Sequence, residues 1–317
     1  MHVLALASAQ SSALGYLLQQ LEIGITRGAL YALIALGYTL VYGIIELINF
    51  AHGDVFMWGT IVTLVLVQAM GLNGPVTGFA LVGVLILLVV VGMLVCGVLN
   101  VTIERLAYRP LRRAPRLAPL IAAIGVSFIL ENVAQLWRGS EFVAFPSLLG
   151  GGFSLGGVQI NAVDIFIIAL ALGLMYGLDR FIRVTRLGRA MRATAQDPEA
   201  AALMGVSIDR TIALTFLIGG ALAGAGAVVY NLNAGQVQFL IGFQLGLIAF
   251  TAAVLGGIGN INGAVLGGFV IGIVEALSIA YIPNGIGWSE VVIFSILVLI
   301  LVFRPSGLLG AQVPDKV

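Results

Sequence analysis

The stretch GALYALIALGYTLVYGIIELINFAHGD, residues 28–54, decides the fold. From Gly28 to Ile45 it carries no charged residue, and this length is close to the ~20 apolar residues with which an α-helix crosses a bilayer. Polar side chains then follow at once, from Glu46 to Asp54. We therefore expect a membrane-spanning helix that ends in a short polar segment.

This polar segment is interpreted as a break between two helices at or near membrane depth. Gly53 is suited to the left-handed position that ends a helix, and Asp54 to the N-cap of the next one. If helical, Glu46, Asn49 and Gly53 would share one face, with His52 beside the turn. Ionisable groups inside a membrane are by default candidates for a translocation path, so all five residues are path candidates. The alternative is a short aqueous loop whose polar groups are only solvated.

The composition of the whole chain agrees with a membrane environment. Of 317 residues, 60% are hydrophobic and only 9% are charged, and the mean hydropathy is +1.12. Soluble domains carry roughly 25% charged residues, so a soluble enzyme, a disordered chain and a disulfide scaffold are excluded. The apolar segments are continuous rather than alternating, which excludes a β-barrel.

We therefore predict an all-α, polytopic membrane helical bundle. It should form one transmembrane domain over residues 1–317, with about eight transmembrane segments, some of them broken or re-entrant. An uncharged stretch between Asp54 and Glu104 is long enough for two membrane crossings. A second uncharged stretch, between Arg210 and Glu275, is long enough for two or three. The remaining candidate spans are 24–45, 117–136, 163–176 and 291–302.

The basic residues orient this bundle. Eleven of the 15 lie in two clusters, residues 105–116 and 180–210, which the positive-inside rule places in the cytoplasm. The stretches 139–161, 231–242 and 283–288 contain no Lys or Arg and are expected outside. The tail with Arg304 and Lys316 should return to the cytoplasm, whereas the side of the N-terminus stays open.

The second cluster contains the signals of a short helix. Asp197 is suited to the N-cap, Pro198 to the first helical position, Glu199 to the first turn and Gly205 to the residue after the helix. A helix this short is marginal in isolation, so it must dock, either on its own bundle or on a cytoplasmic partner. The loop of about 183–210 is therefore a candidate coupling loop.

A glycine-rich turn, Leu255-Gly-Gly-Ile-Gly-Asn260-Ile-Asn262-Gly263, resembles a nucleotide loop only superficially. No Lys-Ser/Thr follows it and both flanks are membrane-apolar, so a phosphate-binding loop is excluded. A break that exposes backbone amides and Asn260 to a cavity fits the context, and a simple helical hairpin fits equally. Asn260 joins the path candidates.

A membrane-embedded enzyme would need clustered acidic, His or Cys side chains. The candidates Glu46, His52, Asp54, Glu131 and Glu275 are scattered along the chain, so no catalytic or metal site is expected. The single cysteine, Cys96, lies in an apolar run and cannot form an internal disulfide.

Together, four segments resemble the first of the two permease subunits of ABC importers for branched-chain amino acids. The resemblance covers residues 20–312, and the segments that carry it are residues 28–54, 189–205, 250–260 and 304–310. Glu199-Ala-Ala-x-x-x-Gly205 also resembles the loop with which ABC permeases contact their ATPase. By this resemblance Arg189, Arg192, Asp197, Glu199 and Gly205 are coupling candidates.

The resemblance implies an assembly in the bacterial inner membrane. Its expected partners are a second homologous permease, two ABC ATPase subunits and a periplasmic or extracellular substrate-binding protein, with no nucleic acid. The chain itself should hold no cofactor, because ATP is used by the partner subunits, and should not be an enzyme. The cargo implied is leucine, isoleucine or valine, and urea or a short amide is the alternative. A channel or secondary transporter is disfavoured, because neither needs an ATPase dock.

Overall fold

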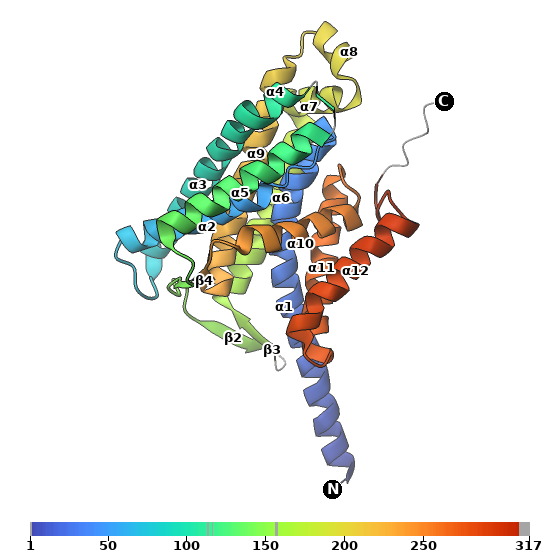
Figure 1. The fold of residues 1–317 in the computed structure, drawn as a ribbon. Coiled ribbons are helices and arrows are strands. Elements are labelled where there is room, and N and C mark those ends of the chain that lie inside the picture. The colour runs from blue at the N-terminus through green and yellow to red at the C-terminus, as the bar shows by residue number, and fades with distance from the viewer. Residues whose placement is uncertain (1, 113, 116, 156–157, 311–317) are drawn as a thin grey trace.

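A computed structural model of the chain describes residues 2–112, 114–115, 117–155 and 158–310, with side chains from residue 13 onward. Arg113, Arg116 and Lys316, which entered the orientation argument, lie outside the described residues. The described part is a bundle of helices, as predicted, and it also contains two short two-stranded sheets that were not predicted (Figure 1). Its elements are α1 (His2–Ile45), α2 (His52–Ala69), α3 (Gly78–Ile103), the π-helical turn η1 (Glu104–Tyr108), α4 (Arg109–Leu111), α5 (Leu117–Arg138), β1 (Val143–Ala144), β2 (Gly152–Leu155), β3 (Val158–Asn161), α6 (Ala162–Val184), α7 (Arg186–Gln196), α8 (Pro198–Leu203), α9 (Ile208–Ala234), β4 (Gln236–Val237), α10 (Ile241–Gly256), α11 (Ile261–Tyr281) and α12 (Gly285–Phe303).

Eight helical segments in the described chain are long and apolar enough to cross a membrane, which confirms the predicted number. The first is longer than expected, because α1 continues outward from Gly24 to His2. The third joins α3, η1 and α4 into one segment, Gly78–Leu111. At 16 residues α10 is only about 24 Å long, so it is shorter than the ~30 Å hydrocarbon core.

Small residues hold the centre of the bundle together. The central helices α1 and α9 pack against α11 and α3, respectively. A Cβ at Gly268 would lie 2.6 Å from Ala32, and a Cβ at Gly224 would lie 2.1 Å from the carbonyl oxygen of Gly92. Such glycines let two membrane helices approach until their backbones touch. This close packing stabilises the bundle, because the hydrophobic effect does not drive helices together within lipid.

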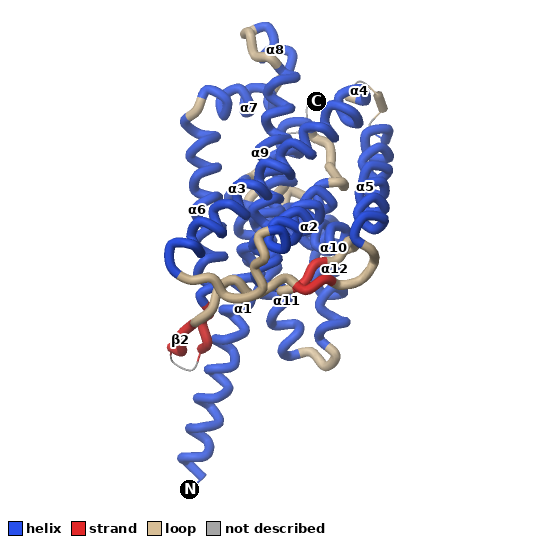
Figure 2. Tube along the Cα trace, turned by 90° about the vertical axis from the view of Figure 1, so that its left-hand side faces the viewer, coloured by secondary structure: helices blue, strands red, loops and turns tan. Residues whose placement is uncertain are grey.

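The two ends of the bundle differ in character. The predicted basic segments lie together at one end with α4, α7 and α8, where Arg109 and Arg112 pair with Asp209 (Figure 1). The start of α1 and the β2–β3 hairpin lie at the opposite end, and Figure 2 shows the same separation from the side. The side of the N-terminus, left open by the sequence, is thus opposite to the arginine-rich end.

The predicted break after the first long helix exists, but its geometry differs from the prediction. The left-handed residue is Glu46, with φ of 52°, and not Gly53. Residues 46–51 are non-helical, so Glu46, Asn49 and Gly53 do not share a helix face. The N-cap of α2 is Ala51, and Asp54 lies inside the first turn.

Gly53 serves close packing instead of a turn. A Cβ at Gly53 would lie 2.2 Å from the carbonyl oxygen of Gly242, at the start of α10. The first turn of α2 therefore touches the backbone of α10. His52 lies in the same turn and contacts α1, because a Cβ at Gly37 would lie 2.2 Å from its Nε2 atom. Gly37 precedes the end of α1 by eight residues, so the chain re-enters the bundle by about 12 Å.

Candidate functional site

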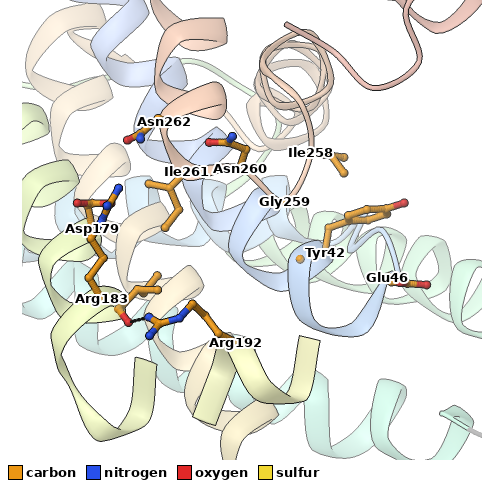
Figure 3. Close-up of a pocket in the computed structure, with 12 residues that line it drawn as sticks. Tyr42, Glu46, Asp179, Arg183, Arg192, Ile258, Gly259, Asn260, Ile261 and Asn262 are labelled. Carbon is orange, nitrogen blue, oxygen red and sulfur yellow. Dashed lines mark hydrogen bonds and ion pairs between the residues drawn. The ribbon is translucent and has the colours of Figure 1, made fainter. Parts of the chain in front are cut away.

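A cavity of about 880 Å³ opens at the arginine-rich end of the bundle, the end with α4, α7 and α8 (Figure 3). We call it the arginine-rich cavity. Four parts of the chain meet there: the end of α1, the last turns of α6, the facing side of α7, and the turn between α10 and α11. Its lining residues are Tyr42, Gly43, Glu46, Asp179, Ile182, Arg183, Arg192, Ile258, Gly259, Asn260, Ile261 and Asn262. Two path candidates, Glu46 and Asn260, and one coupling candidate, Arg192, are therefore brought together.

The charges of this cavity are of both signs. Glu46 is exposed at the break after α1. On α6, Arg183 Nε donates to Asp179 Oδ1 across 2.8 Å, one helical turn apart. A mouth with both signs and neutral amides suits a solute that is itself a zwitterion. Asp179 and Arg183 were not predicted as site residues, because the sequence shows a basic cluster there without indicating which side faces α1.

Asn260 lies at this cavity as expected, but its amide group is used by the fold. Its Oδ1 accepts from Gly263 N at 3.0 Å and so caps α11, and its Nδ2 donates to Leu309 O at 2.7 Å. Gly257 and Gly259 have φ of 106° and 90°, which glycine adopts without strain. The glycine-rich segment is thus a tight helical hairpin whose turn lines a cavity, which combines both predicted alternatives.

Asn49 does not face this cavity. It is 2% exposed and belongs to a buried hydrogen-bonded chain. Tyr108 donates its hydroxyl to Asn49 Oδ1 at 2.9 Å, and Asn49 Nδ2 donates to Asn100 Oδ1 at 3.1 Å. Asn100 and Tyr108 were not predicted, because single polar residues in apolar runs carry no signal of what they contact.

His52, Gly53 and Asp54 are likewise buried within the bundle. The His52 ring packs edge-on against Tyr38, with 4.7 Å between ring centroids. Asp54 Oδ2 accepts a hydrogen bond from Ser127 of α5, whereas Asp54 Oδ1 has no partner among the described residues. Of the five path candidates between residues 46 and 54, therefore, only Glu46 reaches the arginine-rich cavity.

The predicted short helix forms in the basic loop. Asp197 Oδ1 accepts from the backbone N–H groups of Glu199 and Ala200, each at 2.9 Å, and Gly205 has φ of 85°. The four residues predicted for the ends of this helix, Asp197, Pro198, Glu199 and Gly205, are thus placed correctly. This helix, α8, stands out from the bundle beyond α7 (Figure 1).

The tip of α8 exposes apolar side chains. Leu203 is 90% and Met204 is 85% exposed, and Glu199 beside them is exposed as well. Large apolar side chains that share one exposed tip are typical of a contact surface for another protein. The sequence indicated an apolar face on this helix but not that these two residues form its exposed end.

Arg189 and Arg192 have a different position from the tip. Arg192 donates to the carbonyl oxygen of Ile182, and Arg189 Nη1 donates to that of Val184 at 3.1 Å. Both arginines thus donate hydrogen bonds to free carbonyl groups at the C-terminal end of α6, where the helix dipole stabilises positive charge. They tie α7 to α6.

The eight apolar helices and the match to a transport-permease family define a multi-pass membrane protein of the transport-permease class. The family model described as branched-chain amino acid transport system permease component matches residues 20–301. The chain belongs to this family.

Individual relatives agree with this assignment. The chain is 44% identical over 307 residues to the high-affinity branched-chain amino acid transport system permease protein LivH of Escherichia coli K12, covering 95% of this chain and 98% of that protein. It is 45% identical over 309 residues to the corresponding protein BraD of Pseudomonas aeruginosa PAO1, with the same coverage. A probable LivH of Methanocaldococcus jannaschii is 30% identical and covers 92% of each chain. No solved structure matches the chain.

Proposed function

We propose that this chain is one of two permease subunits of an ATP-driven importer for leucine, isoleucine and valine. The observation that carries the proposal, beside the family, is the capped and projecting helix α8 with Leu203 and Met204 exposed at its tip. A permease that works alone needs no such dock. The partners are a second homologous permease, two ABC ATPase subunits and an external substrate-binding protein.

The proposed orientation follows from the arginine-rich end. The positive-inside rule places α4, α7 and α8 in the cytoplasm of a bacterial cell, with the chain embedded in the inner membrane. The described C-terminal end of the chain then also faces the cytoplasm, and the start of α1 faces outward.

The mechanism proposed for this subunit is mechanical. Closure of the ATPase pair on ATP moves α8, and α7 passes that movement to α6 through Arg189 and Arg192. Because the end of α6 is one wall of the arginine-rich cavity, its displacement opens or closes that mouth. Ligand-driven exchange between inward and outward states is the general basis of such transport.

In this proposal the whole chain, residues 1–317, acts as one permease unit with a coupling loop at about 183–210. Glu46 and Asn260 line the cytoplasmic opening of the path. The non-helical segment beside it is fixed to the neighbouring helices by the buried residues Asn49, His52, Gly53 and Asp54. The subunit binds no cofactor, metal or nucleic acid and catalyses no reaction, and ATP hydrolysis belongs to its partners.

The test is uptake into proteoliposomes. The chain is reconstituted with its genomic partner subunits and the binding protein, and offered leucine, isoleucine, valine and urea in turn. We expect uptake of the three amino acids that depends on ATP and on the binding protein. Uptake of urea alone would contradict the cargo, and solute movement by this chain alone without nucleotide would contradict the mechanism.

A matched pair of variants tests α8 in the same vesicles. Glu199→Lys reverses a charge in the first turn of α8 and should abolish uptake, whereas Glu141→Lys makes the same change at the opposite end of the bundle. Membrane insertion and binding-protein docking should stay intact in Glu199→Lys. Unchanged uptake in that variant would contradict a coupling role.

A further inference from the structure

A second cavity, of about 580 Å³, lies between α5 and α10 and shares no lining residue with the arginine-rich cavity. Its size is within the roughly 300–1,000 Å³ of small-molecule sites. Its principal walls are Ser127, Phe128 and Glu131 of α5 and Phe243, Gln244 and Leu247 of α10. The path candidates of the sequence do not include these residues.

Glu131 is the unusual member of this cavity. The residue is only 9% exposed, yet none of the ion pairs or side-chain hydrogen bonds found among the described residues includes its carboxyl group. It lies just past the midpoint of α5, and hence near the middle of the bilayer. An ionisable group at that depth is costly, and it is typical of a site that meets a charged solute.

A second carboxyl group lies directly behind the cavity. Asp54 is fully buried, and its Oδ2 accepts from the hydroxyl of Ser127, which is one helical turn from Glu131 on α5. Its other oxygen, Oδ1, has no partner in the described part of the chain. None of the described lining residues is basic, so the two acids lack a cation that could balance them.

The rest of the cavity is apolar. Phe128, Phe243 and Leu247 face it from both helices, together with Phe50 from the segment between α1 and α2. An acidic end inside an aliphatic and aromatic wall is complementary to a molecule that joins an ammonium group to a branched hydrocarbon chain. It is not complementary to urea, which has neither.

We propose that this cavity is a transport subsite for an aliphatic amino acid. Glu131 receives the α-ammonium group, and the α-carboxylate accepts from the N–H of the Gln244 amide that is not donated to Glu290. Phe128, Phe243 and Leu247 contact the hydrocarbon side chain, and Asp54 acts through Ser127 as a positioning residue. The subsite rests on the proposed function, since it names where the cargo of that importer is held within the bilayer.

The first test compares two acid-to-amide variants in the complete assembly. Glu131→Gln keeps the shape and removes the charge, whereas Glu141→Gln makes the same change three residues beyond the end of α5. We expect leucine uptake to fall about ten-fold or more in Glu131→Gln, as the loss of one charge contact implies, and to stay within about two-fold in Glu141→Gln. ATPase retention and thermal stability are measured in both.

The second test does not depend on the folding of Glu131→Gln. Cys96 is buried, so a Phe128→Cys variant offers one reactive thiol in the cavity. During ATP turnover with leucine-loaded binding protein, leucine should slow thiol labelling about two-fold or more, and urea should not. Adding Glu131→Gln should remove this protection.

The outcomes separate the subsite from the proposed function. If the wild-type assembly transports leucine while Glu131→Gln transports it equally well, the subsite is wrong and the function stands. Labelling of Phe128→Cys that ignores leucine also overturns the subsite, and indicates that lipid fills this cavity. Failure of the wild-type assembly to transport any amino acid overturns the proposed function.

Discussion

Asn49, on the non-helical segment between α1 and α2, donates a hydrogen bond from its Nδ2 to Asn100 Oδ1 of α3 across 3.1 Å. Both side chains are buried. Asn100 in turn donates to the carbonyl oxygen of Phe216 on α9 at 2.7 Å, and Tyr108 donates to Asn49. Since residues 46–51 make no helix, this chain of side-chain bonds anchors the break to two neighbouring helices.

Removing Asn49 should therefore destabilise the bundle. In Asn49→Leu the hydroxyl of Tyr108 and the amide of Asn100 each lose a partner, and side-chain hydrogen bonds between membrane helices are worth about 0.6 kcal/mol on average and at most ~1.7. We expect a loss of about 1–2 kcal/mol, measured by unfolding in detergent. Asn132→Leu is the matched control, since Asn132 is exposed and bonds only within its own helix. Equal stability of the two variants would mean that the buried chain contributes nothing.

Positions 46 and 49 are only three residues apart, but we expect position 46 to be accessible to a water-soluble reagent and position 49 to be inaccessible. Glu46 lines the arginine-rich cavity, whereas Asn49 is 2% exposed. A cysteine at position 46 should react with a small polar thiol reagent from the arginine-rich side, and a cysteine at position 49 should react at least about ten times more slowly. The native Cys96 is buried and gives little background. Comparable rates at both positions would contradict the re-entrant path of this segment.

The tip of α8 should be dispensable for folding and necessary for ATPase binding. Leu203 is 90% exposed, so Leu203→Asp should change the free energy of unfolding by less than about 0.5 kcal/mol. Loss of a central apolar contact costs about 2 kcal/mol of binding, or about 30-fold in affinity, and co-purification of the ATPase should fall accordingly.

Phe153→Asp serves as the control for this experiment. Phe153 is half exposed on the β2–β3 hairpin at the opposite end of the bundle. ATPase co-purification should therefore be unaffected by its substitution. Normal ATPase binding by Leu203→Asp would show that the dock lies elsewhere on the arginine-rich end.

The sequence was informative wherever one local rule decides the structure. Eight apolar segments, and the helix from Pro198 to Leu203 with its Asp197 cap and Gly205, follow from hydrophobicity and capping alone. The break after Ile45 was correctly located because polar residues interrupt an apolar run. Its details were wrong because Glu46, and not a glycine, takes the left-handed conformation.

Contacts between distant segments were beyond sequence reasoning. Glu131 and Asp54 stand far apart along the chain, and only the packing of α2 against α5 places both beside Ser127. Gly53 was read as a turn residue for the same reason, since close approach of a second helix leaves no local signal. The sequence shows which charged residues lie inside apolar runs, but it does not show which residues they contact.

One such partner relation joins Arg27 of α1 to Glu275 of α11. Arg27 Nη1 lies 2.9 Å from Glu275 Oε1, and Tyr31 donates its hydroxyl to the same carboxylate. Arg27→Met leaves that carboxylate, which is 13% exposed, without its cation. Breaking a buried pair costs 3–5 kcal/mol, and because Arg27 is about a third exposed we expect about 2 kcal/mol.

The double variant Arg27→Met/Glu275→Leu tests this account. It removes both charges, so unfolding in detergent should show it to be more stable than Arg27→Met alone. A double variant that loses the sum of the two single effects would indicate that the residues act independently and that the ion pair is unimportant.

The close contact of Gly53 with α10 predicts that a larger residue at position 53 destabilises the bundle. A Cβ at position 53 would lie 2.2 Å from the carbonyl oxygen of Gly242 and 3.0 Å from the Cα of Gly246, so alanine must push two backbones apart. Overpacking of this kind costs about 1–3 kcal/mol, and Gly53→Ala should lower the unfolding temperature. Gly173→Ala on α6 meets nothing within 4 Å and should be neutral or stabilise by up to about 1 kcal/mol, through helix propensity. If Gly53→Ala were as stable as Gly173→Ala, α2 and α10 could not be in backbone contact at this position.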